Sequence, residues 1–292
     1  MEGLVCMRKF YIAGIVGVAA LSLVACNDSA TPVEGTTEKS NLALEEVFNK
    51  TMERQESLKS VKAAVTMDQS STMLIDGEEI TMTTTSNIDM SLTMDPMALF
   101  VDGIMSMKAL DEQDAFEMPL QMYLTEADGF YMNDMMSDGW IKLPDEMYGN
   151  LLAQAGASAD STEQLKQLKP FINDFTFKQT DSAYILTLNA NGEKFKSLIM
   201  EQVSGTLGQQ LESEELSTLE DMQFDNAKYV LTIDKKTFDM TKTVMDLDFN
   251  MEIEGITATI KTSSTINYSD FNKIEAIKIP QNILDTAVDS DF

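Results

Sequence analysis

The chemical groups that most enzymes use are absent or scarce in this chain. Its 292 residues include no histidine, which excludes imidazole general bases, Ser-His-Asp and Cys-His nucleophiles, and His-ligated metals. Its two cysteines, Cys6 and Cys26, both lie near the N-terminus. The 48 acidic residues are enough to form a glycosidase-like carboxylate pair. With so many carboxylates, however, a solvated acidic surface is the simpler explanation. We therefore expect no enzymatic activity and no cofactor, with a hydrolase as the remaining enzymatic alternative.

The charge balance limits the partners of the protein. Lys and Arg number 21 against 48 Asp and Glu, which gives a formal net charge of -27. Such an acidic chain repels the phosphates of nucleic acids, so we expect no nucleic-acid partner. None of its acidic clusters has the D-x-[DN]-x-[DN]-G spacing of a calcium loop, so we expect no metal site. The hydrophobic fraction of 43% is enough for a packed core.

Methionine is the unusual residue of this composition, because 22 methionines outnumber the 14 glycines. Flexible, polarisable thioethers line surfaces that adapt to variable apolar partners, and they also fill irregular cores. Filling a core is the commoner role of such a stripe of methionines. A cavity wall is the alternative, and both interpretations remain open. The candidate cavity residues are Met67, Met73, Met82, Met90, Met94, Met118, Met122, Met245, Phe249 and Met251.

The N-terminus has the layout of a secretory signal. A short basic region precedes an apolar stretch over residues 10–24, which is short for a transmembrane helix. The end of this stretch, Leu23-Val24-Ala25-Cys26, resembles the bacterial lipobox. The resemblance implies diacylglyceryl transfer to the Cys26 thiol and cleavage between Ala25 and Cys26. An uncleaved anchor helix with an incidental cysteine is the alternative.

This signal predicts the compartment and the first segments of the chain. We expect a signal peptide over residues 1–25, with Met7 as an alternative start, and a lipidated flexible tether over residues 26–40. The lipid anchor would hold the mature protein on the extracytoplasmic face of the cell membrane. The mature chain would have no free thiol and no disulfide, so packing alone must stabilise it.

Apolar spacing predicts the elements that follow. Leu44, Val47, Phe48 and Met52 share one face of a helix that begins near Asn41 and ends near residue 60. The period then becomes two, which predicts strands and a long first hairpin with its turn at residues 76–77. The expected strands cover residues 61–75, 80–94, 99–107, 116–124, 129–135, 140–143, 175–179, 184–189, 229–233, 245–253, 256–268 and 274–279. Further helical segments are expected at 144–152, 161–168 and 191–221.

The order of these elements predicts a single α+β domain over residues 41–292. It lacks the strand-helix-strand alternation of a doubly wound parallel sheet, which argues against the usual solute-binding proteins of transporters. Long strands with one apolar face need a cover, and the helical segments can supply it. We therefore expect one large, curved antiparallel β-sheet, a half-barrel, wrapped around helices.

Local patterns in these strands carry a family resemblance. The first comprises Met122-Tyr123-Leu124, Asp128-Gly129-Phe130-Tyr131-Met132 and Gly139-Trp140-Ile141-Lys142-Leu143. The second runs from Tyr229 through Asp234-Lys235-Lys236-Thr237 to Ile279-Pro280 and Ala287. Together with the lipobox, they resemble a family of Gram-positive surface lipoproteins of unknown function over about residues 40–288. That family is similar in fold to outer-membrane lipoprotein carriers (LolA-like) and to mycobacterial lipid-carrier lipoproteins, whose half-barrels hold acyl chains between sheet and helices.

The resemblance implies a function by analogy of fold. We expect a membrane-anchored lipoprotein that binds a lipid or another hydrophobic ligand between its sheet and its helices. The alternative is an envelope sensory or protein-interaction module with no small-molecule ligand. Such a module would bind an envelope protein through its polar sheet face, which includes Asp246, Asp248 and Glu252, or through exposed acidic helices.

Overall fold

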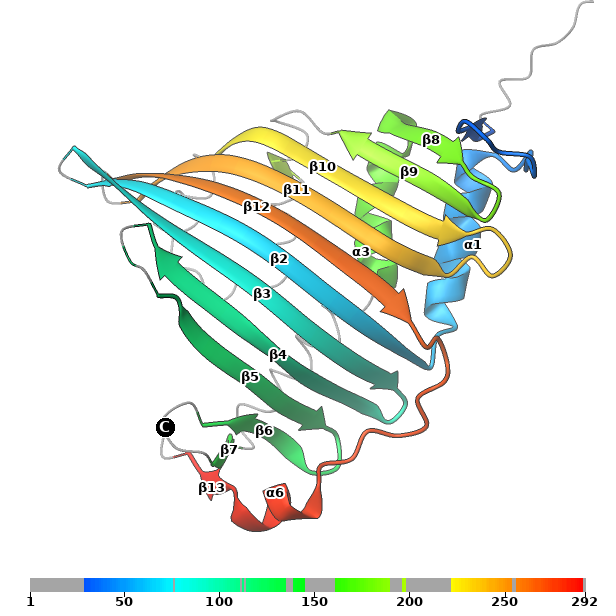
Figure 1. The fold of residues 1–292 in the computed structure, drawn as a ribbon. Helices are drawn as coiled ribbons and strands as arrows, with labels where there is room; N and C mark the ends of the chain where they lie inside the picture. The colour runs from blue at the N-terminus through cyan, green and yellow to red at the C-terminus, as the bar shows by residue number, and fades with distance from the viewer. Residues whose placement is uncertain are drawn as a thin grey trace, which may run out of the picture.

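The computed structural model describes residues 29–75, 77–110, 112, 114–134, 139–144, 161–189, 196–197, 222–253 and 256–290. These residues form one open, mixed β-sheet of 13 strands with few helices (Figure 1). The strands lie side by side in the order β1-β8-β9-β10-β11-β12-β2-β3-β4-β5-β6-β7-β13. Their bounds are β1 Thr31–Pro32, β2 Ser60–Ile75, β3 Glu78–Met94, β4 Met97–Ala109, β5 Phe116–Thr125, β6 Gly129–Asn133, β7 Trp140–Lys142, β8 Phe175–Gln179, β9 Ala183–Asn189, β10 Gln223–Asp234, β11 Met240–Ile253, β12 Ile256–Ser269 and β13 Val288–Asp289.

The central strands follow the period-two pattern of the sequence. β2 and β3 pair along their whole length, from Ser60 opposite Thr93 to Ile75 opposite Glu78. Gly77 lies in the turn between them with a φ of 85°, a conformation that glycine adopts readily because it has no Cβ. β11 and β12 form a second long antiparallel pair. The long hairpins expected from the sequence are therefore confirmed.

The edges of the sheet differ from the expected all-antiparallel arrangement. The edge strands β1 and β13 run parallel to their neighbours β8 and β7, whereas the pairs between them are antiparallel. Both edge strands reach the sheet from distant parts of the chain, so no hairpin imposes an antiparallel direction. Each is only two residues long. Such short strands blunt an edge that would otherwise be a template for pairing with another chain.

The register divides the sheet into two faces. We call the inner face the one against which the helices α1 (Leu44–Glu56) and α3 (Ser161–Leu168) pack, and the outer face the opposite one. Leu231 of β10 is buried beneath these helices. Its row of directly paired residues continues through Thr243 of β11 and Ile266 of β12 to Val65 of β2. Because directly paired residues share a face and successive residues alternate, the odd-numbered positions of β2 belong to the inner face.

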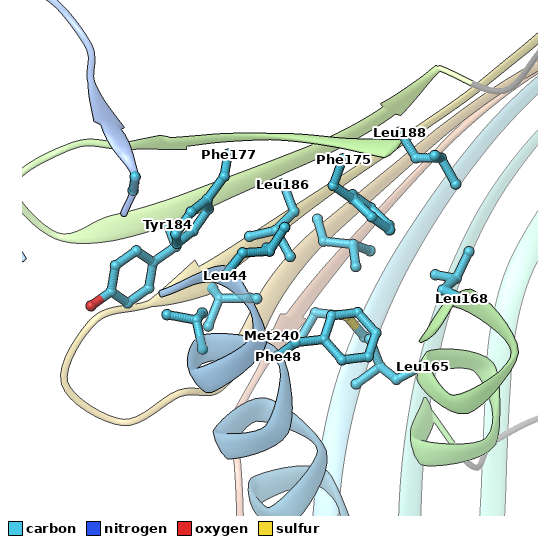
Figure 2. Close-up of a cluster of buried hydrophobic side chains, with 14 of the residues drawn as sticks. Leu44, Phe48, Leu165, Leu168, Phe175, Phe177, Tyr184, Leu186, Leu188 and Met240 are labelled. Atoms are coloured by element: carbon cyan, nitrogen blue, oxygen red, sulfur yellow. The ribbon is translucent and has the colours of Figure 1, made fainter. Parts of the chain in front are cut away.

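The helices bury a core against the β8–β11 end of the inner face. The apolar residues of α1 recur at helical spacing, and Val47 and Phe48 are 0% exposed. The Phe48 ring lies 6.4 Å from that of Phe175 on β8. Arg54 Nε donates to Asp239 Oδ1 at 2.6 Å, which ties the end of α1 to the β10–β11 turn. Figure 2 shows this core, which includes Leu44, Phe48, Leu165, Leu168, Phe175, Phe177, Tyr184, Leu186, Leu188 and Met240.

Residues 29–40 lie along β8, whereas the sequence predicts a flexible tether there. Ala30 is buried in the core beneath the helices. Gln179, itself 1% exposed, donates from Nε2 to the Ala30 carbonyl at 2.6 Å and accepts at Oε1 from the Ser40 N–H at 2.8 Å. The small polar composition of this segment suits either a coil or a docked strand, and these long-range hydrogen bonds select the docked form.

The β8–β9 turn attaches the same segment a second time. Asp181 Oδ1 accepts hydrogen bonds from the backbone N–H groups of Thr37 and Glu38 at 2.6 and 2.8 Å. These hydrogen bonds, that from Glu38 first, hold the pKa of Asp181 below its usual value because they favour the ionised carboxylate.

The C-terminal segment packs on the outer face, over the opposite end of the sheet (Figure 1). The helix α6 (Gln281–Thr286) buries Ile283 against Tyr131 of β6. The strand expected over residues 274–279 is wrong, because this stretch is irregular. The Ile274 N–H donates to Ser60 Oγ at 3.1 Å rather than to a strand, and Ile279 is buried beside Ile283. Its apolar residues therefore make contacts with one side of the sheet without extending it.

The remaining predicted helices are described only in part. The helix expected at 161–168 is confirmed as α3, and a 3-10 helix, η1 (Lys169–Asp174), continues it. The helices expected at 144–152 and 191–221 lie almost entirely outside the described residues. The exceptions are Pro144, which is not helical, and Lys196 and Ser197, which are helical.

Replacing Gln179 with Leu should release residues 29–40 from β8. The variant would leave the Ala30 carbonyl and the Ser40 N–H without the partners that Gln179 supplies. Since an unsatisfied buried polar group costs about 1–3 kcal/mol, we expect the free energy of unfolding to fall by about 2–4 kcal/mol. Urea denaturation measures this loss, and hydrogen exchange should show faster exchange of the Ser40 amide. Lys178→Gln, at the exposed neighbouring position, is the control and should change neither quantity.

Candidate ligand-binding face

All of the candidate cavity residues lie on the inner face. Met90 is opposite Ala63 on β2 and Val101 on β4. Met245 is opposite Ser264, which is opposite Met67. The same alternation places on this face Met73, Met82, Met94, Met118, Met122, Phe249 and Met251. The structure thus brings these residues onto one surface, and their contact with a ligand stays a prediction.

These side chains are not sealed in a core. All are half-buried except Met82, which is 37% exposed. Ile80 and Phe116 continue the apolar surface at the far ends of β3 and β5, with exposed fractions of 42% and 63%. The inner face therefore has two parts. A closed core lies beneath α1 and α3 at the β8–β11 end. A partly accessible, methionine-rich surface lies on β2–β5, where Leu92, Val101 and Leu124 between the methionines are 6%, 2% and 5% exposed.

Further methionines belong to the same surface and were left out of the candidate residues. They include Met105 and Met107 on β4 and Met132 on β6. Met105 is opposite Met118, and Met132 is opposite Met122. The signal for the β4 pair was present in the sequence, because both alternate in phase with other apolar residues of the expected strand at 99–107.

Charge is segregated between the two faces of the sheet. In β2–β5, β11 and β12, Glu78, beside the first hairpin turn, is the sole charged residue at an inner-face position. A charge on the inner face would lose hydration without gaining a partner. The inner face therefore offers apolar and uncharged polar contacts. The charged residues at outer-face positions of these strands are Lys62, Asp68, Glu79, Asp89, Asp102, Lys108, Glu117, Lys242, Asp246, Asp248, Glu252 and Lys261.

The outer face carries a groove of different chemistry. Its volume is about 1000 Å³, and it is lined by side chains that include Asp89, Asp102, Gln121 and Trp140. Gln121 Nε2 donates to Asp102 Oδ1 at 2.7 Å. Among the described residues, no group of three or more His, Cys, Asp or Glu side chains could hold a metal ion. The groove therefore combines carboxylates and amides with apolar side chains such as Ile104 and Pro119. The candidate methionines lie on the other face of the sheet.

Two tyrosines border the closed core on the inner face. Burial raises the pKa of Tyr229 on β10 to about 12. Burial also raises the pKa of Tyr268 on β12, although a hydrogen bond with the Thr243 side chain acts in the opposite direction. Both phenols consequently remain neutral well above pH 7 and bring no negative charge to the inner face.

The predicted lipidation site, Leu23, Val24, Ala25 and Cys26, lies outside the described residues and stays a prediction. The description begins at Ser29, whose backbone forms a β-bridge with Ala43 just before α1. Within the described part of the chain, none of the helices has the length and apolarity needed to cross a membrane.

The chain matches the model of a family of unknown function (DUF6612) over residues 43–288. No curated protein matches it. Among solved structures, it aligns with a β-barrel-like protein of a domain of unknown function (DUF1849) from Brucella abortus, with 11% identity, over 73% of this chain and 99% of the other, at a TM-score of 0.19. A DUF1329 family protein from Desulfovibrio piger aligns with 8% identity over 80% of this chain and 95% of its own, also at a TM-score of 0.19.

Replacing Tyr229 with Phe should reduce the loss of stability at alkaline pH. In the unfolded chain this phenol ionises at its usual pKa of 10.0, whereas in the folded protein its pKa is about 12. Between these two pH values the phenol ionises in the unfolded chain but remains protonated in the folded protein. The contribution of Tyr229 to stability is therefore complete below pH 10 and is lost as the pH rises towards 12. The wild-type free energy of unfolding should fall by about 2–3 kcal/mol more than that of the variant across this range. Urea denaturation at successive pH values tests this, and parallel curves would contradict it.

Proposed function

This chain belongs to a family of unknown function (DUF6612), and we propose its function from its own residues. The protein is a non-enzymatic lipoprotein, anchored by Cys26 to the extracytoplasmic face of the cell membrane. It binds a lipid or another hydrophobic ligand on the inner face of its sheet. The observation that carries this proposal is the partly accessible, methionine-rich surface of β2–β5, on which Glu78 is the sole charged residue.

The chemistry of this surface suits an acyl chain. Contiguous apolar surface that remains accessible to water is typical of a binding site. Each methylene group of a ligand that is transferred from water to this surface would contribute about 0.8 kcal/mol. Methionine side chains adapt to chains of different shape because they are unbranched and have several rotatable bonds. The charged residues of these strands remain on the outer face, where water solvates them.

The sheet would act as a half-barrel similar to that of the LolA-like outer-membrane lipoprotein carriers. The curvature of the central strands towards the side of α1 and α3 supports this comparison (Figure 1). The space directly beneath these helices is filled by the core around Phe48 and Leu165. A ligand would therefore lie beside the closed core, over β2–β5, rather than beneath α1 and α3.

The anchor would hold the domain close to the membrane. Ser29 is already attached to the fold through its bridge with Ala43, and Cys26 precedes it by three residues. Three extended residues span at most about 10 Å. The edge of the sheet formed by β1 and β8 would therefore lie within about 10 Å of the lipid headgroups, a closer position than a free tether would give.

The acidic outer face favours a protein-interaction module as the second candidate function. The groove of about 1000 Å³ on this face would accommodate part of a partner protein. We rank this function second because neighbouring residues of the sheet already pair with part of the acidic surface. Asp246 accepts from Ser263 Oγ at 2.8 Å and from Lys228 Nζ at 3.4 Å. These pairs leave less charge for a partner to neutralise.

Replacing Cys26 with Ala should release the protein from the membrane without unfolding it. Cell fractionation should move the variant to the soluble fraction, and incorporation of labelled fatty acid should cease, because the thiol that accepts the lipid is gone. The matched control is Cys6→Ala, which changes a cysteine upstream of the expected cleavage site and should leave both readouts unchanged. A Cys26→Ala variant that remains membrane-bound and labelled would contradict the anchor.

Replacing Met90 with Ala should weaken ligand uptake more than it weakens the fold. Met90 is half-buried, so its truncation should lower the free energy of unfolding by less than the ~2–5 kcal/mol expected for a packed core methionine. Uptake of a fluorescent acyl-chain probe should decrease, because Met90 forms part of the proposed contact surface. Ile104→Ala is the control, because Ile104 is an apolar residue of the outer face that is 50% exposed.

The wild-type protein supplies the decisive comparison. Native mass spectrometry and lipid extraction of the purified mature domain should detect a bound lipid. If no lipid co-purifies and the wild-type protein takes up no probe, the inner face is not a binding site, and the protein-interaction function becomes the better account of the molecule.

A further inference from the structure

The inner face contains a buried hydroxyl group that lacks a hydrogen-bond partner. Ser86 of β3 is 2% exposed, and its Oγ has no hydrogen-bond partner among the described residues. It belongs to the inner face because it is directly opposite Met67 on β2 and Met105 on β4. Buried hydroxyls nearly always have partners, because an unpaired one loses its hydration without compensation.

A row of uncharged polar residues crosses the inner face beside Ser86. Thr262 of β12 is opposite Gln69 of β2, which is opposite Thr84 of β3. All three are half-buried, and Thr84 precedes Ser86 by two residues on the same strand. Methionines lie on both sides of this row along β2. The methionine-rich surface is thus interrupted at one level by groups that donate and accept hydrogen bonds without carrying charge.

We propose that the Ser86 hydroxyl binds the polar head of a neutral acyl lipid, through an ester carbonyl or a hydroxyl group, while the acyl chain lies along the methionines. A monoacylglycerol or a diacylglycerol has this chemistry. The proposal rests on the proposed function and names the class of its ligand.

The charges of the sheet distinguish this class from other lipids. A hydrocarbon would leave the Ser86 hydroxyl as unpaired as it is without a ligand. An ionised fatty acid would bring a carboxylate to a surface on which β2–β5, β11 and β12 place no Lys or Arg at an inner-face position. Neutral hydrogen-bond donors alone would then have to offset the desolvation of the carboxylate, with no cation to pair with it. A neutral ester satisfies the hydroxyl and loses little hydration.

Ser86→Ala tests the proposal in the full mature protein. The probes are monopalmitoylglycerol, palmitic acid and hexadecane, each measured by displacement of a fluorescent acyl-chain probe. In the wild type, monopalmitoylglycerol should bind most tightly. The variant should bind monopalmitoylglycerol about 3- to 10-fold more weakly, which is the net effect of one hydrogen bond, and should bind hexadecane unchanged. The unfolding temperature without ligand should stay the same or rise, because the variant removes an unpaired buried group.

Ser106→Ala is the matched control, because Ser106 is a half-buried serine on the outer face of the neighbouring strand β4. It should leave the affinities for all three probes unchanged. Equal affinity of Ser86→Ala and the wild type for monopalmitoylglycerol would overturn the proposal while leaving ligand binding itself intact. An equal loss for hexadecane and monopalmitoylglycerol would also overturn it, because the role of Ser86 would then be packing. If none of the probes binds to the wild type, the proposed function itself fails.

Discussion

In the long central strands, a shift of one residue in the pairing would exchange the two faces of the sheet. Such a shift between β2 and its neighbours would carry Lys62 and Asp68 to the inner face and leave Val65 and Met67 in water. The register of these ladders is therefore selected by the segregation of charge from apolar side chains. The composition of each face, and the side of the sheet on which the helices pack, both follow from this alternation.

Within the described part of the chain, the helices α1 and α3 pack at one end of the sheet. α1 buries Phe48 among β8–β11, and the contact between Arg54 and Asp239, which are 23% and 9% exposed at their side chains, fixes the end of the helix. The apolar surface on β2–β5 lies away from this core. Its methionine side chains can therefore change conformation without disturbing the residues that hold the helices, which would suit the proposed binding of a hydrophobic ligand.

Alternation also explains which parts of the fold could be predicted from the sequence. The hairpin of β2 and β3 and the pair β11–β12 were recovered because period-two patterns persist over more than ten residues. The edge strands β1 and β13 have two residues each and carry no periodic signal. The docking of residues 29–40 depends on Gln179, which is more than 100 positions away along the chain, so local composition could not distinguish this segment from a tether. The stretch at 274–279 shows the opposite error, because its apolar residues alternate without a strand partner.

The same reasoning located the methionine surface but not the polar group within it. A polar residue in an apolar stripe interrupts the periodic signal, so Thr84 and Ser86 were passed over between Met82 and Ile88. Their significance arises only from three facts that the ladders reveal together: Ser86 is buried, its hydroxyl is unpaired, and the row from Thr262 to Thr84 passes beside it. A purely structural interior would more simply place alanine or valine there, because an unpaired hydroxyl weakens the fold. A serine at that position is accounted for if the energy of its missing hydrogen bond is recovered from a ligand.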